Sequence, residues 1–599
     1  GTRDTTMKKF NKMALLGAIV ISTLFLGIAN PAAAQDETVF LYGVPGASIL
    51  RDVDHHEAWD SSSIDVMYNV MEGLVGHDLS DDALPIVPML ATAWTWSADN
   101  MEITFTLREG VTFHDGSAFN ATAVKWNFDR LNAFTVGNGT QAEVANSICQ
   151  VAELYAPLNG ATVIKETVVD SEYSVTVKLN YVYGPFLPLM CFTASWMGAI
   201  DSMPWAMDYD NEVIGSYGDG DQMIGTGPFV YDADNIYDAD ELDFIAYEDY
   251  WGEQPSIQEM IWVRYANTEA VNQALLNGDI HFPAASLPEF YDQFEAAPTV
   301  TLGESRCGTG ITYMGMHIPN VNAAFREAIS FALDYDYIIE ELLLGYAARL
   351  KSPVPLGIND AIEPADVGIF NLTRARQSLF DNGVLVESND LNMSDDFGDA
   401  DWIARSESNP IATFNYTYNI GSSLRYDMGT IVEENMKRIG VDVELRGITW
   451  SAFLDRLYGD WHKLELYLVG WGPDYNDASN FINPLFSNTS GSNSAQVNDD
   501  EVQTKMMEAL STTDAAERTT LYEEIQTRIV EEIRPWCFIS VGLGRSAWDY
   551  RVSNFPRNAM GNLYFYPVVW DPSAPVPREG IPGFNLIALI GVAAFGLFI

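Results

Sequence analysis

Segments with strand-like and helix-like patterns alternate along most of this chain, and that alternation limits its fold more than any other feature. Residues 101–108 (MEITFTLR) carry an apolar side chain at every second position, as a half-buried strand does. Residues 268–278 instead show apolar residues at helical spacing, with Thr268 placed as a cap and Gly278 as the end. No fixed-period repeat is visible, which argues against a solenoid or propeller. We therefore expect an α/β protein.

The charge of the chain restricts its partners. Its 599 residues include 83 acidic and 32 basic side chains, a formal net charge of −51. Nucleic-acid binding requires clustered Lys and Arg, yet no Lys lies between Lys178 and Lys351. We therefore expect no nucleic-acid partner. Because 47% of the residues are apolar and 15 are Trp, the chain can nevertheless bury large cores, and its length predicts three or four structural units.

The acidic surface also predicts a habitat. Charge of one sign keeps a protein soluble and monomeric through self-repulsion, and salt screens that repulsion. We therefore expect a monomer in a salty extracellular setting.

The N-terminal segment resembles an export signal. Lys8, Lys9 and Lys12 precede an apolar run over residues 13–29, and small residues follow at 31–35. This arrangement predicts a secretory signal peptide over residues 1–34, with an uncleaved anchor helix as the alternative.

The C-terminal segment is also distinctive. A Pro-rich linker over residues 572–584 leads into an apolar run that continues to Ile599. We predict a truncated transmembrane anchor over residues 585–599, with a buried core helix as the alternative. The membrane is thus an expected partner, and the outer face of the cell membrane the expected location.

Cysteines and glycosylation sequons fit an exported chain. Four cysteines without CxxC spacing permit zero, one or two disulfides. Asn-x-Ser/Thr sequons permit surface glycosylation. The cysteines are Cys149, Cys191, Cys307 and Cys537, and the sequons begin at Asn120, Asn138, Asn371, Asn392, Asn415 and Asn488.

An ordered set of motifs carries a family resemblance. The segment FTLREGVTFHDG at 105–116 closely resembles the signature of solute-binding proteins family 5, the extracytoplasmic oligopeptide/dipeptide-type receptors of ABC importers. The matches that follow in family order are GTGPF (225–229), YWG (250–252), ALLNGDI (274–280), FREAISFALD (325–334) and GWGPDY (470–475).

The resemblance implies a periplasmic-binding-protein type II fold. Two α/β lobes would surround a ligand cleft, the chain would cross between them twice, and an additional domain would be inserted in the first lobe. By motif position, the first lobe takes residues 37–76, 182–299 and 541–571, the inserted domain 77–181, and the second lobe 300–540.

The resemblance also implies a function without catalysis or cofactors. Such a receptor captures a peptide-like solute by lobe closure and delivers it to membrane permease subunits. The chain lacks GxxxxGK[ST], so ATPase activity would belong to partner subunits. Family members also take sugars and metal complexes, which remain alternative ligands.

The most informative local site follows a strand-like segment at 464–469. Ligands of open α/β sheets bind beyond the carboxyl ends of strands. There Trp471 offers an aromatic wall, Gly472 permits close backbone approach, and Asp474 offers a carboxylate, with Tyr475 beside it. The resemblance implies that the matching Asp pairs with the α-ammonium group of a peptide. A cap of the following helix is the alternative, which we favour for Asp477.

Three weaker candidates occupy positions that line or adjoin the cleft in related proteins. These are Tyr313 in the second lobe and Tyr68 and Asn69 in the first. Structural packing is an equal alternative for each.

Rival sites have less support. The pair His55-His56 lacks a third ligand at useful spacing, and adjacent side chains are expected to diverge, so we predict no metal site. His114-Asp115 belongs to a turn in the resemblance. A secreted hydrolase would be the main rival class, but neither GxSxG nor HExxH is present. A structural surface protein would need repeats that are missing.

Overall fold

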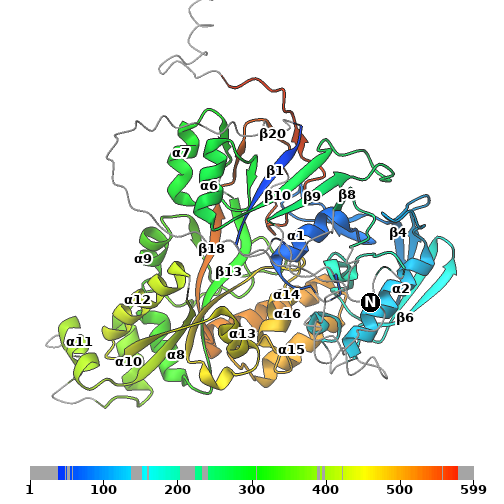
Figure 1. Ribbon diagram of the computed structural model, residues 1–599. Helices are drawn as coiled ribbons and strands as arrows, with labels where there is room; N and C mark the ends of the chain where they lie inside the picture. Colours follow the sequence, from blue (N-terminus) through cyan, green and yellow to red (C-terminus); the bar gives the residue numbers. More distant parts are fainter. Residues whose placement is uncertain are drawn as a thin grey trace, which may run out of the picture. The chain divides into compact units, whose positions relative to one another are not determined.

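The computed structural model describes most of the chain between residues 38 and 577 (Figure 1). The predicted signal peptide (1–34) and anchor (585–599), the end of the linker, Asn138 and Cys149 lie outside the described residues. Among the residues that are described, none of the helices combines the length and the apolar character that a membrane span requires. The described residues are 38–46, 49, 54–56, 58–136, 151–157, 161–200, 202, 223–231, 240–304, 306–386, 391–393, 398–420, 422–555 and 558–577.

The first of three main sheets has five strands and confirms the α/β prediction. Strand β1 pairs in parallel with β10 and β11, while β9 joins the central strand β10 in antiparallel orientation. Helices α1 (Ser61–Val70), α6 (Thr268–Asn277) and α7 (Tyr291–Ala296) belong to the same region of the fold (Figure 1). In spatial order the strands are β11 (Phe282–Pro283), β1 (Phe40–Pro45), β10 (Glu259–Tyr265), β9 (Glu241–Ala246) and β8 (Phe229–Tyr231).

The second sheet is a four-stranded antiparallel sheet packed against helix α2 (Ala121–Val136). The period-two pattern of the sequence is confirmed here, because Ile103, Phe105 and Leu107 are buried while Glu102 and Thr106 are exposed. The strands in spatial order are β4 (Ala91–Trp96), β5 (Glu102–Leu107), β7 (Ser174–Leu179) and β6 (Ile164–Ser171).

The third sheet has six strands and separates two cores. Successive side chains of one strand enter opposite cores, as Tyr313 and Met314 do. Figure 1 shows α8, α10 and α12 on one side of this sheet and α15 and α16 on the other. The strands are β14 (Ala347–Arg349), β18 (Trp536–Gly544), β13 (Arg306–Met316), β17 (Leu466–Trp471), β15 (Thr413–Asn419) and β16 (Asp442–Ile448). The helices are α8 (Ala323–Ala332), α10 (Leu372–Asp381), α12 (Ser423–Lys437), α13 (Trp450–Tyr458), α14 (Ser479–Phe486), α15 (Asp500–Ser511) and α16 (Ala515–Thr527).

Two chain segments run side by side from the first sheet to the third. Strand β12 (Val300–Leu302) pairs with β19 (Ala547–Asp549), and β13 then pairs with β18. Between these pairs, the backbone N–H of Gly303 donates to the carbonyl of Ser546 at 2.9 Å. Strand β18 continues to Gly544, beyond the predicted end of the second lobe at residue 540. The domain boundaries remain a prediction.

Shorter elements complete the described fold. They are α4 (Ala152–Tyr155), α5 (Phe186–Met190), α9 (Tyr335–Tyr337), α11 (Asp399–Ser408), β2 (Val75–His77), β3 (Ile86–Pro88), β20 (Val552–Ser553) and β21 (Val569–Trp570).

The ends of α6 correct one local prediction. The helix is capped by Asn267, whose Oδ1 accepts the backbone N–H of Ala270 at 2.8 Å, so Thr268 is the first helical residue and not the cap. Gly278 ends the helix at φ +81°, as predicted.

Two cysteines are free thiols. Cys191 and Cys537 are both buried, in different hydrophobic cores. Formation of two disulfides is therefore ruled out.

Candidate functional site

A pocket of about 290 Å³ lies where α1 meets the loop that follows β17. One wall of the pocket carries Asp65 and Asn562, which lie nearly 500 residues apart in the sequence. The other wall is the segment from Gly470 to Asp474. Among the described residues, its lining contains two carboxylates, five aromatic side chains and no Lys or Arg. The lining residues are Trp59, Ser61, Ile64, Asp65, Tyr68, Phe192, Tyr458, Gly470, Trp471, Gly472, Pro473, Asp474, Met560, Gly561 and Asn562.

Asp474 is half-buried in this pocket and accepts hydrogen bonds from neutral donors. Its Oδ1 accepts from the indole Nε1 of Trp59 at 2.7 Å, and its Oδ2 accepts from Nδ2 of Asn480 at 2.7 Å. Burial raises the pKa of Asp474 to about 6, although the bonds from Asn480 and Trp59 oppose that rise. A charge-assisted bond to a bound cation would therefore be favourable here.

Helix α14 has no side-chain cap hydrogen bond, so the capping role favoured for Asp477 is wrong, although Asp477 lies just before the helix. Asp477 accepts the backbone N–H of Ser479 at 2.9 Å and also pairs with Arg518 at 2.9 and 3.0 Å. Asp474 makes no such bond to the first turn of α14, whose cap position is Ala478.

Trp471 and Gly472 line the pocket beside Asp474. The ring of Trp471 meets that of Trp59 edge to face, with centroids 5.7 Å apart. Its buried Nε1 has no hydrogen-bond partner among the described residues. A Cβ at Gly472 would meet no atom within 4 Å, whereas a Cβ at Gly470 would lie 2.9 Å from the carbonyl oxygen of Ile311. Within the protein, no close backbone approach therefore occurs at Gly472, where we expected one, whereas Gly470 makes such an approach.

Tyr68 lines the opposite wall. Its hydroxyl accepts a hydrogen bond of 2.5 Å from Nδ2 of Asn562. Burial raises the pKa of Tyr68, with further contributions from Cys191, Asp65 and Asp474. Both pocket carboxylates are thus electrostatically close to this ring.

Three predicted residues do not line the pocket. Asn69 is buried and ties α1 to a distant segment, donating to the carbonyls of Asp65 and Leu563 and accepting from the N–H of Phe565. Tyr313 is buried and stacks on Trp536 at 3.6 Å. Tyr475 is buried in the core beneath the second sheet. Each of the three residues supports the surrounding packing. For Tyr313 and Asn69, packing was the alternative to ligand contact.

We did not predict several of the lining residues, including Trp59, Asp65, Tyr458 and Asn562. A signal existed for Asp65, because it precedes Tyr68 by three residues on one helix and shares its face. Trp59 and Asn562 lie outside helices and strands, and no local pattern marks them.

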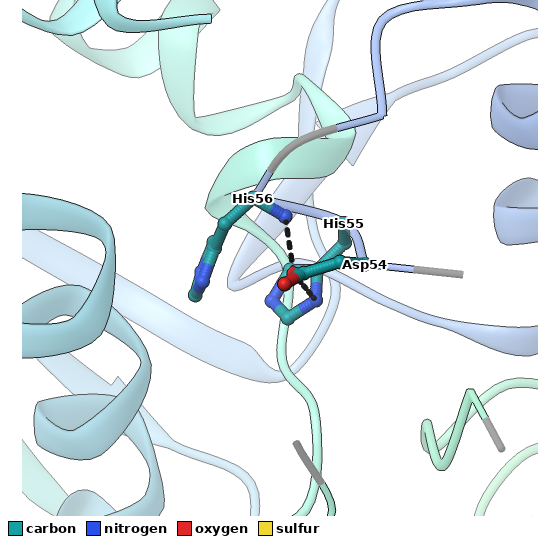
Figure 2. A group of neighbouring side chains, drawn as sticks. All are labelled: Asp54, His55 and His56. Carbon is teal, nitrogen blue, oxygen red and sulfur yellow. Dashed lines mark hydrogen bonds and ion pairs between the residues drawn. The ribbon is translucent and has the colours of Figure 1, made fainter. Parts of the chain in front are cut away.

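A second cluster, Asp54, His55 and His56, has the composition of a metal site (Figure 2). Our expectation that the two imidazoles diverge is wrong, since their centroids lie 3.9 Å apart, and Asp54 supplies the third group we did not find. All three residues are buried.

The Arg130 guanidinium occupies the position that a cation would need in this cluster. It bonds both oxygens of Asp54 at 2.8 and 2.5 Å and lies 2.6 Å from Nδ1 of His56. Burial lowers the pKa of His55 to about 4 and that of His56 well below its usual value. These residues fit a buried ion pair with neutral imidazoles better than a metal ion.

His114 is also structural. Its Nε2 lies 2.9 Å from the carbonyl oxygen of Gly227, while Asp115 accepts the N–H of Ser117 within the same turn.

Comparison with known proteins supplies the family. Residues 85–493 match the model of bacterial extracellular solute-binding proteins, family 5 (middle). The chain is 24% identical over 545 residues to the glutathione-binding protein of Pectobacterium atrosepticum, covering 88% of this chain and 93% of that relative. It is 25% identical over 525 residues to heme-binding protein A of Haemophilus influenzae, covering 81% and 84%.

A solved structure shows the same fold. The periplasmic binding protein DppA of Helicobacter pylori, in complex with the peptide STSA, superposes with a TM-score of 0.72 at 20% identity. The match covers 89% of this chain and 98% of that one. The chain therefore belongs to the family 5 extracellular solute-binding proteins, which are binding components of ABC importers and not enzymes.

Proposed function

We propose that this protein captures peptide-like solutes through their free amino terminus and delivers them to an ABC permease driven by ATPase subunits. The observation that carries the proposal is the half-buried Asp474 carboxylate, which lines a pocket without Lys or Arg and is bonded only to neutral donors among the described residues. Such a carboxylate favours a ligand cation. The glutathione-binding relative and the peptide complex of the solved structure support a peptide-like ligand.

Ligand capture would depend on contact between the two walls. Trp59 from one wall bonds Asp474 and packs against Trp471 of the other. A ligand that contacts both walls would shift an open–closed equilibrium toward the closed state. Tyr68, Trp471 and Gly472 would then bound the ligand, with Asn69, Tyr313 and Tyr475 holding the surrounding structure.

We propose that ligand capture takes place outside the cytoplasm. The predicted signal (1–34) would export the chain, and the apolar segment 585–599 would hold it at the outer face of the membrane. Fractionation of cells that express the protein with and without residues 585–599 tests the anchor, which predicts membrane association only when the segment is present.

Calorimetric titration with trialanine and N-acetyl-trialanine tests the function. In Asp474→Asn, affinity for trialanine should fall about tenfold or more, because a charge-assisted bond is lost, while affinity for the acetylated peptide should stay unchanged. Asp427→Asn removes an exposed charge on α12 that does not line the pocket, and should bind as the wild type does. Equal losses for both peptides would defeat the role assigned to Asp474.

A further inference from the structure

The pocket contains a second carboxylate, from Asp65 on α1, that the proposed function does not use. Its Oδ1 accepts the backbone N–H of Leu563 at 3.2 Å, and its Oδ2 accepts no hydrogen bond from the described residues. Within the described ranges, Asp65 forms no ion pair with Lys, Arg or His. Asp65 thus retains more acceptor capacity than Asp474, both of whose oxygens are engaged.

The backbone around Asp65 is held firmly. Nδ2 of Asn69 donates to the carbonyl of Asp65 at 2.8 Å and to that of Leu563 at 3.0 Å. The N–H of Phe565 donates to Oδ1 of Asn69 at 2.9 Å. Because these bonds join α1 to the segment beside it, the Asp65 carboxylate is positioned before a ligand arrives.

The surroundings of the two carboxylates suit cations. Trp59, Tyr68 and Trp471 offer ring faces or edges in the same pocket, and a cation beside an aromatic face is stabilised. Since Asp65 and Asp474 lie on different walls of one pocket of about 290 Å³, a ligand of modest size can reach both.

We propose that Asp65 is a specificity-determining residue that selects ligands with a second cationic group close to the α-ammonium, such as peptides that begin with Lys or Arg. This inference rests on the proposed function, in which Asp474 takes the α-ammonium. Burial raises the pKa of Asp65 to about 8, so in the empty pocket at neutral pH this group is largely protonated. Binding of a second cation should therefore release a proton, whereas a ligand with the α-ammonium alone should leave Asp65 protonated.

The test compares Lys-Ala-Ala with norleucine-Ala-Ala, which has a similar side chain without the charge. Wild-type protein should bind Lys-Ala-Ala about tenfold more tightly. In Asp65→Asn this preference should vanish while affinity for norleucine-Ala-Ala is retained, which also shows that the variant is folded. Asp427→Asn should keep the wild-type preference. Titrations at pH 7 in buffers of different ionisation enthalpy should show proton release for Lys-Ala-Ala alone, and only with Asp65 present.

Other outcomes separate the two proposals. Equal wild-type affinities for the two peptides, or equal losses for both in Asp65→Asn, would overturn the role of Asp65 and leave peptide capture standing. If neither peptide binds the wild type, peptide capture fails, and cadaverine and pentylamine then replace the peptides. If the wild type prefers cadaverine and Asp65→Asn abolishes that preference, the role of Asp65 stands. If the wild type shows no preference for cadaverine, that role is overturned too.

Discussion

The indole Nε1 of Trp59 donates a hydrogen bond of 2.7 Å to Oδ1 of Asp474, a residue 415 positions further along the chain. The two rings of Trp59 and Trp471 meet beside this bond. One side chain thus joins the two walls of the pocket and touches the carboxylate to which we assign ligand binding.

Removal of this bond is a direct test of its importance. Trp59→Phe keeps an aromatic ring but deletes the donor, so we expect ammonium-bearing peptides to bind about tenfold more weakly at pH 7. The pKa of Asp474 should also rise above about 6, because the Trp59 bond lowers it. Trp450→Phe, at a Trp that is 45% exposed, provides the control. Unaltered affinity in Trp59→Phe would show that the bond does not contribute to binding.

Binding of peptides should depend on pH in a defined direction. Because the pKa of Asp474 is raised to about 6, its carboxylate is ionised above that pH and protonated below it. Affinity for trialanine should therefore fall as the pH drops below about 6, and fall again above about 8 as the α-amino group loses its proton. Titrations from pH 4.5 to about 9 test this profile. N-acetyl-trialanine should give a flat profile at the acidic end, and an identical acidic fall for both peptides would contradict the assignment.

The buried pair of Asp54 and Arg130 should be essential for stability. Both side chains are fully buried, so Arg130→Met would leave the Asp54 carboxylate without its cation. Breaking such a pair costs about 3–5 kcal/mol of unfolding free energy. Urea unfolding measures the loss, and adding Asp54→Asn should restore part of it. Arg446→Met, at an exposed ion pair, should have little effect. Equal, small effects at both sites would contradict the importance of burial.

Salt should stabilise the folded protein. The net charge of −51 implies strong self-repulsion, and raising KCl from about 0.1 M to about 2 M shortens the screening length to a few ångströms. We expect Tm to rise across this range. Sucrose at matched osmolality distinguishes screening from solute exclusion, because it carries no charge. A constant Tm in KCl would remove the hypothesis of a salty habitat.

Local patterns in the sequence were sufficient for much of the fold. The alternation over residues 101–108 predicted a strand, which is observed as β5 with one buried face. The ordered motifs identified the family and the loop that carries Asp474. These predictions succeed because period and turn chemistry depend on neighbouring residues.

The tertiary structure alone decided how the pocket is assembled. It placed Trp59, Asp65 and Asn562 beside Asp474, and it placed Arg130 in the cluster that otherwise resembles a metal site. It also buried Tyr313 and Tyr475 in hydrophobic cores, so that neither lines the pocket. Contacts between residues separated by tens to hundreds of positions depend on how sheets and helices pack, and no local period in the sequence records that packing.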